Sequence, residues 1–166
     1  MMNEDPKNLT PKAHRFSFHS ANAMLPLVQS IAKDVHMLLK TIGETKERLS
    51  AINVTKPSSS RSPSFSDPQA TPYAREVQSI IANVDQKQVR LDDCVKELED
   101  LNLVAPEVDR PFVDFPAIYD GKDVCLCWKI GEDKILHWHL PEEPCGDRRP
   151  VDLDLVPTKN ELSGSL

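Results

Sequence analysis

The chain contains 166 residues, of which 39% are apolar, and it has a formal net charge of -6. This length suits one domain, and the low apolar fraction indicates that part of the chain is tail or linker. The acidic balance argues against a protein that neutralises phosphates, so we expect no nucleic-acid partner. No stretch approaches the roughly 20 apolar residues of a membrane span, and the N-terminus lacks the apolar core of a signal peptide. We therefore expect a cytoplasmic protein with no membrane contact.

The cysteines indicate free thiols. The chain is too long to depend on disulfides for its core. Cys125 and Cys127 would point the same way on a strand, with Cα atoms about 6.6 Å apart, which makes a bridge between them awkward. The four cysteines are Cys94, Cys125, Cys127 and Cys145.

The first long periodic stretch predicts a helix over residues 17–52. Ser17 is a suitable N-cap, and Phe16 before it is placed to pack on the first turn. Pro26 removes a backbone donor, so we expect a kink near that residue. Apolar residues recur three and four apart, which is a heptad pattern. These residues are Phe18, Ala21, Leu25, Val28, Ala32, Val35, Leu39, Ile42 and Leu49.

A second helix is predicted over residues 72–103. Thr71 followed by Pro72 gives an N-cap with proline at the first helical position. The heptad pattern repeats in this helix. The simplest arrangement of the two helices is a long antiparallel helical hairpin. Because one seam covers only one face of each helix, we expect a further layer from the C-terminal region or from a second copy of the hairpin. The seam residues are Tyr73, Val77, Ile80, Val84, Lys87, Leu91, Cys94, Leu98 and Leu101.

The apolar spacing changes to two over residues 111–141, which predicts strands. Asp120-Gly121 and Gly131-Glu132-Asp133 are turn sequences. The predicted fold class is therefore α+β and mostly α, with a three-stranded antiparallel β-meander after the hairpin. The strands are predicted over residues 112–119, 124–130 and 135–140.

Alternation along these strands assigns residues to two faces. The apolar face is expected to pack on the helices, which makes both tryptophans core residues rather than a stacking platform for a ligand. It holds Val124, Leu126, Trp128, Ile130, Leu136, Trp138 and Leu140. The opposite face holds Cys125, Cys127, Lys129, Ile135, His137 and His139.

The remaining segments complete a single domain over residues 16–150. Residues 142–150 are predicted to form a loop that closes the meander. Residues 1–15 are predicted as a flexible lead-in and residues 151–166 as a polar tail. Residues 53–70 are dominated by Ser and Pro, so we interpret them as a flexible connector between the helices.

Several short motifs occur together in this chain, from the first helix to the meander. They are Ala21-Asn22, Leu25-Pro26, Val113–Pro116, Leu126–Trp128, Gly131-Glu132, Trp138-His139 and Asp147–Pro150. In these motifs the chain resembles DUF2203, a family of uncharacterised bacterial proteins. The sequence departs from the family pattern at Pro111 and Asp147, where the family usually has glycine. The resemblance implies a shared fold and no established activity.

The first candidate site is a metal site made by Cys125, Cys127, His137 and His139. Strand alternation places these side chains on one face of neighbouring strands, and they are the donors of a tetrahedral zinc site. However, zinc holds its sulfur ligands within roughly 4 Å of each other, which is closer than residues two apart on a flat strand. The alternative is that the side chains pack across strands beneath a loop.

The second candidate site is a polar pocket of Asp114, Cys127, Glu132, His139 and Arg148. Here Cys127 would be a nucleophile with His139 as its base, or His139 a general base oriented by Asp114. No phosphate loop, nucleophile elbow or zinc-protease helix accompanies these residues. They also suit binding of a small anion or peptide, or simple turn caps with a Glu132–Arg148 ion pair.

Together these patterns favour a non-enzymatic interaction or small-ligand-binding module. We expect a protein partner or self-association through the helices. The alternative is a metal-binding protein, with zinc, or an enzyme that uses Cys127 and His139 with Asp114, Glu132 and Arg148.

Overall fold

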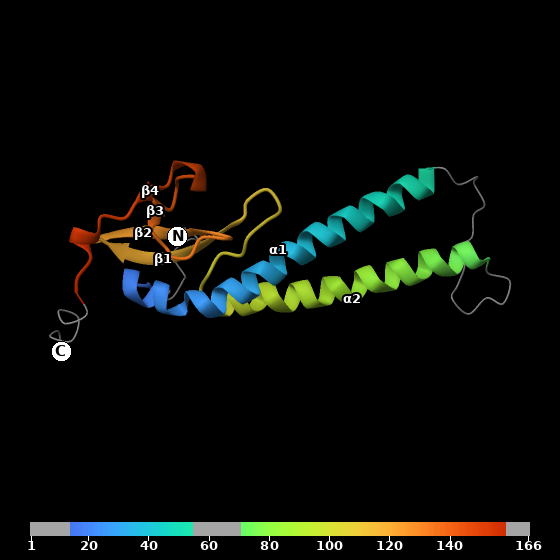
Figure 1. The fold of residues 1–166 in the computed structure, drawn as a ribbon, viewed down its shortest axis with the longest axis horizontal. Coiled ribbons are helices and arrows are strands. Elements are labelled where there is room, and N and C mark those ends of the chain that lie inside the picture. Colours follow the sequence, from blue (N-terminus) through green and yellow to red (C-terminus); the bar gives the residue numbers. More distant parts are fainter. Residues whose placement is uncertain (1–13, 55–70, 159–166) are drawn as a thin grey trace, which may run out of the picture.

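The computed structural model describes residues 14–54 and 71–158. Two helices, α1 (Phe18–Val54) and α2 (Pro72–Asp100), are followed by strands β1 (Phe112–Tyr119), β2 (Lys122–Lys129), β3 (His137–His139) and β4 (Arg149–Pro150). Short 3-10 turns, η2 (Cys145–Asp147) and η3 (Leu153–Leu155), flank β4. The fold is α+β and mostly α, with the sheet at one end of a long antiparallel hairpin (Figure 1). Residues 1–13 of the predicted lead-in, 55–70 of the predicted connector and 159–166 of the predicted tail lie outside the described residues, and α1 includes residues 53–54, where the connector was predicted to begin.

Both helices begin at the predicted caps. Ser17 Oγ accepts a hydrogen bond from the Ser20 N–H at 3.0 Å, and Ser20 Oγ accepts one from the Ser17 N–H at 2.8 Å. The Thr71 side chain accepts from the Ala74 N–H, with proline at the next position. These bonds satisfy N–H groups that have no partner inside the helix.

The C-terminus of α2 comes before the predicted residue 103. Asn102 has a left-handed φ of 62°. The Asn102 N–H donates to the Glu99 carbonyl, and the Leu103 N–H donates to the Leu98 carbonyl. This is a Schellman motif, in which Leu98 and Leu103 are both buried.

The heptad seam packs α1 against α2. Along α1 it buries Ala21, Leu25, Val28, Ala32, Val35 and Ile42, and along α2 it buries Val84, Leu91, Cys94 and Leu98. The helix α1 continues through Pro26 without interruption. Figure 1 shows its first turns inclined to the rest of the helix, as the proline predicts.

The four strands form an antiparallel sheet in the order β1-β2-β3-β4. Asp120 and Gly121 both have positive φ, 50° and 71°, so they form the predicted tight turn between β1 and β2. Residues before α1 also join the sheet. The Phe16 N–H donates to the Pro116 carbonyl at 2.8 Å, and the Phe16 ring packs edge-on against Phe115.

The third predicted strand is shorter than expected, and its residues point differently. Only His137–His139 pairs as a strand, because residues 130–136 form a turn and an irregular segment. The prediction that Leu136 faces the core is therefore wrong, since it is 42% exposed, whereas Ile135 is fully buried. The Ile135 N–H donates to Asn22 Oδ1 at 2.9 Å, which fixes this segment to α1.

The structure also extends the predicted meander. Arg149–Pro150 pairs with β3 as a fourth strand. Val151 is buried, and its N–H donates to the Leu136 carbonyl at 2.8 Å. The fold therefore includes residues just beyond 150.

One face of the sheet packs on the helices as predicted. Val113, Phe115, Leu126 and Trp128 are fully buried and share one core with the seam residues of the hairpin. Trp138 is only partly buried, and the Arg149 guanidinium lies 4.7 Å from the centre of its ring. Trp128 is thus the tryptophan that fills the space between sheet and helices.

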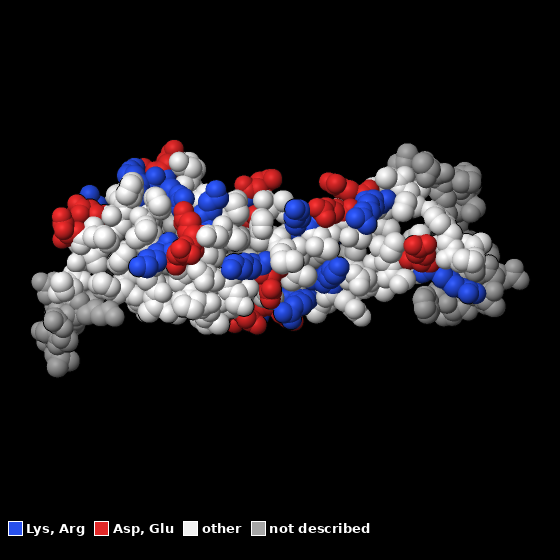
Figure 2. All heavy atoms as spheres, viewed as in Figure 1, with Lys and Arg blue, Asp and Glu red and all other residues white. Residues whose placement is uncertain are grey.

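The surface carries both signs of charge. Lys and Arg alternate with Asp and Glu over the face shown in Figure 2, with no large patch of one sign. Neither described helix combines the length and apolar character needed to cross a membrane.

Candidate metal centre

Four side chains with metal-binding atoms meet on the other face of the sheet. Asp114 of β1, Cys127 of β2, His139 of β3 and Cys145 of η2 offer one ligand atom each. All four atoms lie within 4.8 Å of one another, and all four residues are buried. Four separate elements thus contribute to one compact cluster, which we call the Asp-Cys-His-Cys cluster.

Strand register explains three of the four positions. Asp114 pairs directly with Cys127, and His139 pairs with Cys125. His139 therefore lies one step along the sheet from the Asp114–Cys127 row, on the same face. Diagonal neighbours across a sheet remain within reach of a long side chain. His139 Nε2 lies 3.1 Å from Asp114 Oδ1.

A short loop delivers the fourth residue. After β3, the Leu140 N–H donates to Glu143 Oε2 at 2.9 Å, and the Glu143 N–H donates to the Leu140 carbonyl at 3.0 Å. The turn η2 then places Cys145 Sγ 3.7 Å from Asp114 Oδ1 and 3.7 Å from His139 Nε2. The loop therefore closes over the sheet and buries the cluster.

The tautomer of His139 follows from its neighbours. Its Nδ1 lies 2.7 Å from the Leu140 carbonyl, which can only accept, so Nδ1 must carry a proton. Nε2, in contrast, faces a carboxylate oxygen and a sulfur. In metal sites, a ligating histidine commonly donates its second ring N–H to a backbone carbonyl in this way.

Arg110 contacts two members of the cluster. Its Nη2 donates to Asp114 Oδ2 and, at 3.0 Å, to Cys145 Sγ. The negative charge of Asp114 raises the pKa of the Arg110 guanidinium, against the lowering effect of its burial. Asp114 thus directs one oxygen at the arginine and the other into the cluster.

Arg148 provides a second guanidinium beside the cluster. It forms a two-pronged ion pair with Glu132, at 2.6 and 3.0 Å. Burial raises the pKa of Cys127, and the positive charge of Arg148 partly offsets that rise. This hydrogen bonding with Glu132 raises the pKa of Arg148. Burial acts to raise the pKa of Glu132, but the hydrogen bond from Arg148 acts to lower it, and the net pKa is lowered.

Burial holds the neighbouring thiols in their protonated form. It raises the pKa of Cys125 to about 11. Burial, reinforced by the charge of Asp114, also raises the pKa of Cys127 well above its usual value. A divalent ion would reverse this effect, because a coordinated thiol is deprotonated.

The residues of the predicted polar pocket lie close together. Asp114, Cys127 and His139 belong to the cluster, and the Glu132–Arg148 pair adjoins it through Cys127. Asp114, His139 and Cys145 do not have the geometry of a catalytic Cys-His-Asp triad, since Asp114 and Cys145 both approach Nε2 of His139. A triad needs the thiol and the carboxylate on opposite ring nitrogens.

The predicted metal ligands divide into two pairs. Cys127 and His139 belong to the cluster, whereas Cys125 and His137 are not among its members. His137 Nδ1 is buried and has no hydrogen-bond partner among the described residues. Arg110 and Cys145 were not predicted as site residues, although the position of Cys145 a few residues after His139 is a spacing found in metal sites.

Other hollows in the surface do not coincide with the cluster. One of about 360 Å³ is lined by residues that include Phe16 and Tyr119, and one of about 460 Å³ is lined by residues that include Pro26 and Leu153. None of the four cluster residues lines either hollow. These two hollows are therefore separate from the cluster, whose four residues are buried.

Fold and site together define an α+β protein with a buried Asp-Cys-His-Cys cluster at the base of a helical hairpin. Comparison with family models matches residues 14–151 to DUF2203, described as an uncharacterized conserved protein. The chain belongs to this family, as the sequence motifs indicated. No curated protein and no solved structure matches the chain.

Proposed function

We propose that this chain is a non-enzymatic protein that binds one zinc ion through Asp114, Cys127, His139 and Cys145. The observation that carries the proposal is the convergence of these four ligand atoms within 4.8 Å. Sulfur, imidazole and carboxylate are the ligands that zinc takes in tetrahedral sites. Calcium and magnesium are disfavoured because they require oxygen ligands.

The charges at the cluster support a divalent ion. In the metal-bound form, one carboxylate and two thiolates carry three negative charges. A divalent cation and the Arg110 guanidinium, which contacts both Asp114 and Cys145, balance them. Burial of an unbalanced charge is unfavourable, so this neutrality supports the proposed set of ligands.

The ion would act as a structural cross-link. It would join three strands and the η2 turn, and two of the elements concerned are only three residues long. Because all four coordination positions come from the protein and all four residues are buried, no position is left for a substrate. A closed site of this kind contributes to folding rather than to catalysis.

Elemental analysis tests the proposal. Protein purified without chelators should contain about one zinc per chain. Cys145→Ser should lose the zinc, while the matched variant Cys125→Ser, which changes a thiol outside the cluster, should keep it. Zinc-free wild-type protein that cannot be reloaded, or equal zinc loss in both variants, would overturn the proposal.

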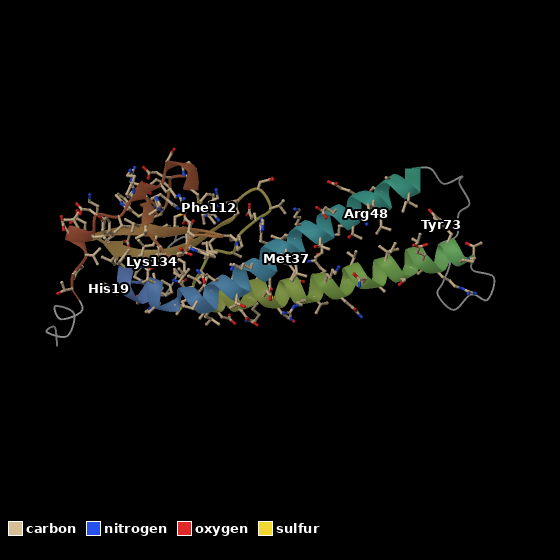
Figure 3. The ribbon with its side chains drawn as sticks, in the orientation of Figure 1. His19, Met37, Arg48, Tyr73, Phe112 and Lys134 are labelled. Atoms are coloured by element: carbon tan, nitrogen blue, oxygen red, sulfur yellow. The ribbon has the colours of Figure 1, made fainter. Side chains whose placement is uncertain are left out.

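The hairpin supports a second proposal, that the chain self-associates. We place the protein in the bacterial cytoplasm, where free thiols persist. Met37 of α1 is 67% exposed and Val89 of α2 is 63% exposed. Figure 3 shows Met37 on the hairpin beyond the sheet. A shallow hollow beside Met37 is lined by residues of both helices, including Lys87 and Arg90. We infer that a second copy of the chain covers these exposed apolar side chains in a four-helix arrangement.

Light scattering tests this second proposal. Wild-type protein should be a dimer, and Met37→Glu combined with Val89→Glu should give a monomer of unchanged helical content. Val108→Glu is the matched control, because Val108 is 51% exposed but lies outside the helices. A monomeric wild-type protein, or a dimer that survives the double change, would refute it.

A further inference from the structure

We propose that Cys127 and Cys145 form a redox switch, in which a peroxide converts them to a disulfide and expels the metal ion. The inference rests on the proposed zinc site and adds a means of regulating it. It uses two members of the Asp-Cys-His-Cys cluster and leaves Cys125 and Cys94 unchanged.

The two sulfur atoms are already close. They belong to the set of ligand atoms that lie within 4.8 Å of one another. The described cysteines are all free. A disulfide requires the sulfurs to approach to about 2.05 Å, which a small shift of the loop that carries Cys145 would supply.

One of the two sulfurs is held by a guanidinium. Arg110 Nη2 donates to Cys145 Sγ at 3.0 Å. Arg110 therefore holds the Cys145 sulfur in the cluster without a metal ion. The thiolate is the form of either cysteine that reacts with peroxides.

The two cysteines differ in how firmly they are held. Cys127 lies in the middle of β2, between two paired strands. Cys145 lies in a single 3-10 turn, supported by the Asp147 N–H to Pro144 carbonyl bond at 3.0 Å. Short surface turns open at lower free energy than central strands. Cys145 is thus the sulfur that peroxide would reach first.

The chemistry then proceeds in two balanced steps. The Cys145 thiolate attacks one peroxide oxygen, the O–O bond breaks, and a sulfenic acid forms while hydroxide leaves and is protonated to water. The Cys127 thiolate attacks the Cys145 sulfur, the S–O bond breaks, and a second hydroxide leaves as water. The thiolates lose two electrons in total and hydrogen peroxide gains them. Zinc stays divalent and dissociates because two of its four ligands are gone.

The test uses full-length Cys125→Ser protein. Trypsin cleaves after Lys122, Lys129, Lys134 and Arg148, so Cys125 and Cys127 share the peptide 123–129, whereas Cys145 lies in 135–148. Removing Cys125 makes any cross-link between these peptides specific to Cys127. Zinc content is measured first, and hydrogen peroxide is then added with a zinc-sensitive dye.

The expected result is release of about one zinc per chain, appearance of the cross-linked peptide pair, and recovery of zinc binding after reduction by a thiol. The proposal would be overturned if zinc stays bound after peroxide is added, or if zinc is released without a disulfide between Cys127 and Cys145. Failure of the proposed zinc site itself would be seen earlier, as absence of zinc before peroxide is added. Catalase added before peroxide is the control, and it should abolish both signals.

Discussion

His139 Nε2 lies 3.1 Å from Asp114 Oδ1, although the Leu140 carbonyl at 2.7 Å already holds the proton of His139 on Nδ1. A neutral imidazole would therefore present a lone pair to a carboxylate oxygen. Two acceptors at this distance need either a shared proton or a metal ion between them. The sulfur of Cys145, 3.7 Å from the same nitrogen, favours the metal ion.

Removal of the metal ion should destabilise the protein. An ion present at 100 times its dissociation constant adds about 2.7 kcal/mol to the free energy of unfolding. This corresponds to a fall in Tm of roughly 5–11 °C when a chelator is added to a domain of this size. Thermal denaturation followed by circular dichroism measures the effect. His139→Asn should melt at the same temperature with and without chelator. A wild-type Tm that does not change when chelator is added would contradict the prediction.

Arg110 should strengthen metal binding without touching the ion. Its hydrogen bonds to Asp114 and Cys145 orient both ligands and neutralise charge. Loss of such a supporting contact typically weakens metal affinity by about 10- to 100-fold. Arg110→Met should show this loss in a competition titration against a zinc-binding dye. Arg15→Met, which removes an arginine paired with exposed Asp123, should bind zinc as the wild type does.

The Glu132–Arg148 ion pair should make stability depend on pH. The hydrogen bond from Arg148 outweighs burial and lowers the pKa of Glu132 in the folded chain. Its stabilisation is then fully present above the carboxyl pKa of the unfolded chain and is lost as the pH falls through the lower folded value. Glu132→Gln should reduce the free energy of unfolding of chelator-treated protein by about 1–3 kcal/mol at pH 7.

Urea denaturation of wild type and Glu132→Gln at several pH values measures this effect. The difference between the two proteins should shrink as the pH falls below the usual carboxyl range. Glu76→Gln, a change at an exposed position of α2, should follow the wild type throughout. If the difference in free energy of unfolding between Glu132→Gln and wild type does not change with pH, the charge of Glu132 is not the cause of that difference.

The two tryptophans should differ in their contribution to stability. Trp128 is fully buried, and its Nε1 donates to the Glu132 carbonyl at 2.8 Å. Trp128→Ala should reduce the free energy of unfolding by about 3–5 kcal/mol. Trp138 is only partly buried, with Arg149 over its ring, so Trp138→Ala should cause a clearly smaller loss. Urea denaturation of both variants compares them, and equal losses would contradict the packing described here.

The sequence by itself determined the two helices, the first two strands and one face of the sheet. Heptad spacing and the caps Ser17 and Thr71 specify the helices because they act within a few residues of the chain. Alternation along β2 likewise identified Leu126 and Trp128 as core residues. The same alternation failed at Leu136, because the segment before β3 is irregular and its direction is set by the contact of Ile135 with Asn22.

Only the tertiary structure decided which polar residues form the site. Strand alternation placed Cys127 and His139 on one face, but it could not rank them above Cys125 and His137 as ligands. That choice depends on the diagonal offset of Asp114 and His139 across three strands and on the loop that brings Cys145 over them. Loop direction and long-range register follow from packing between distant parts of the chain, so no local pattern records them.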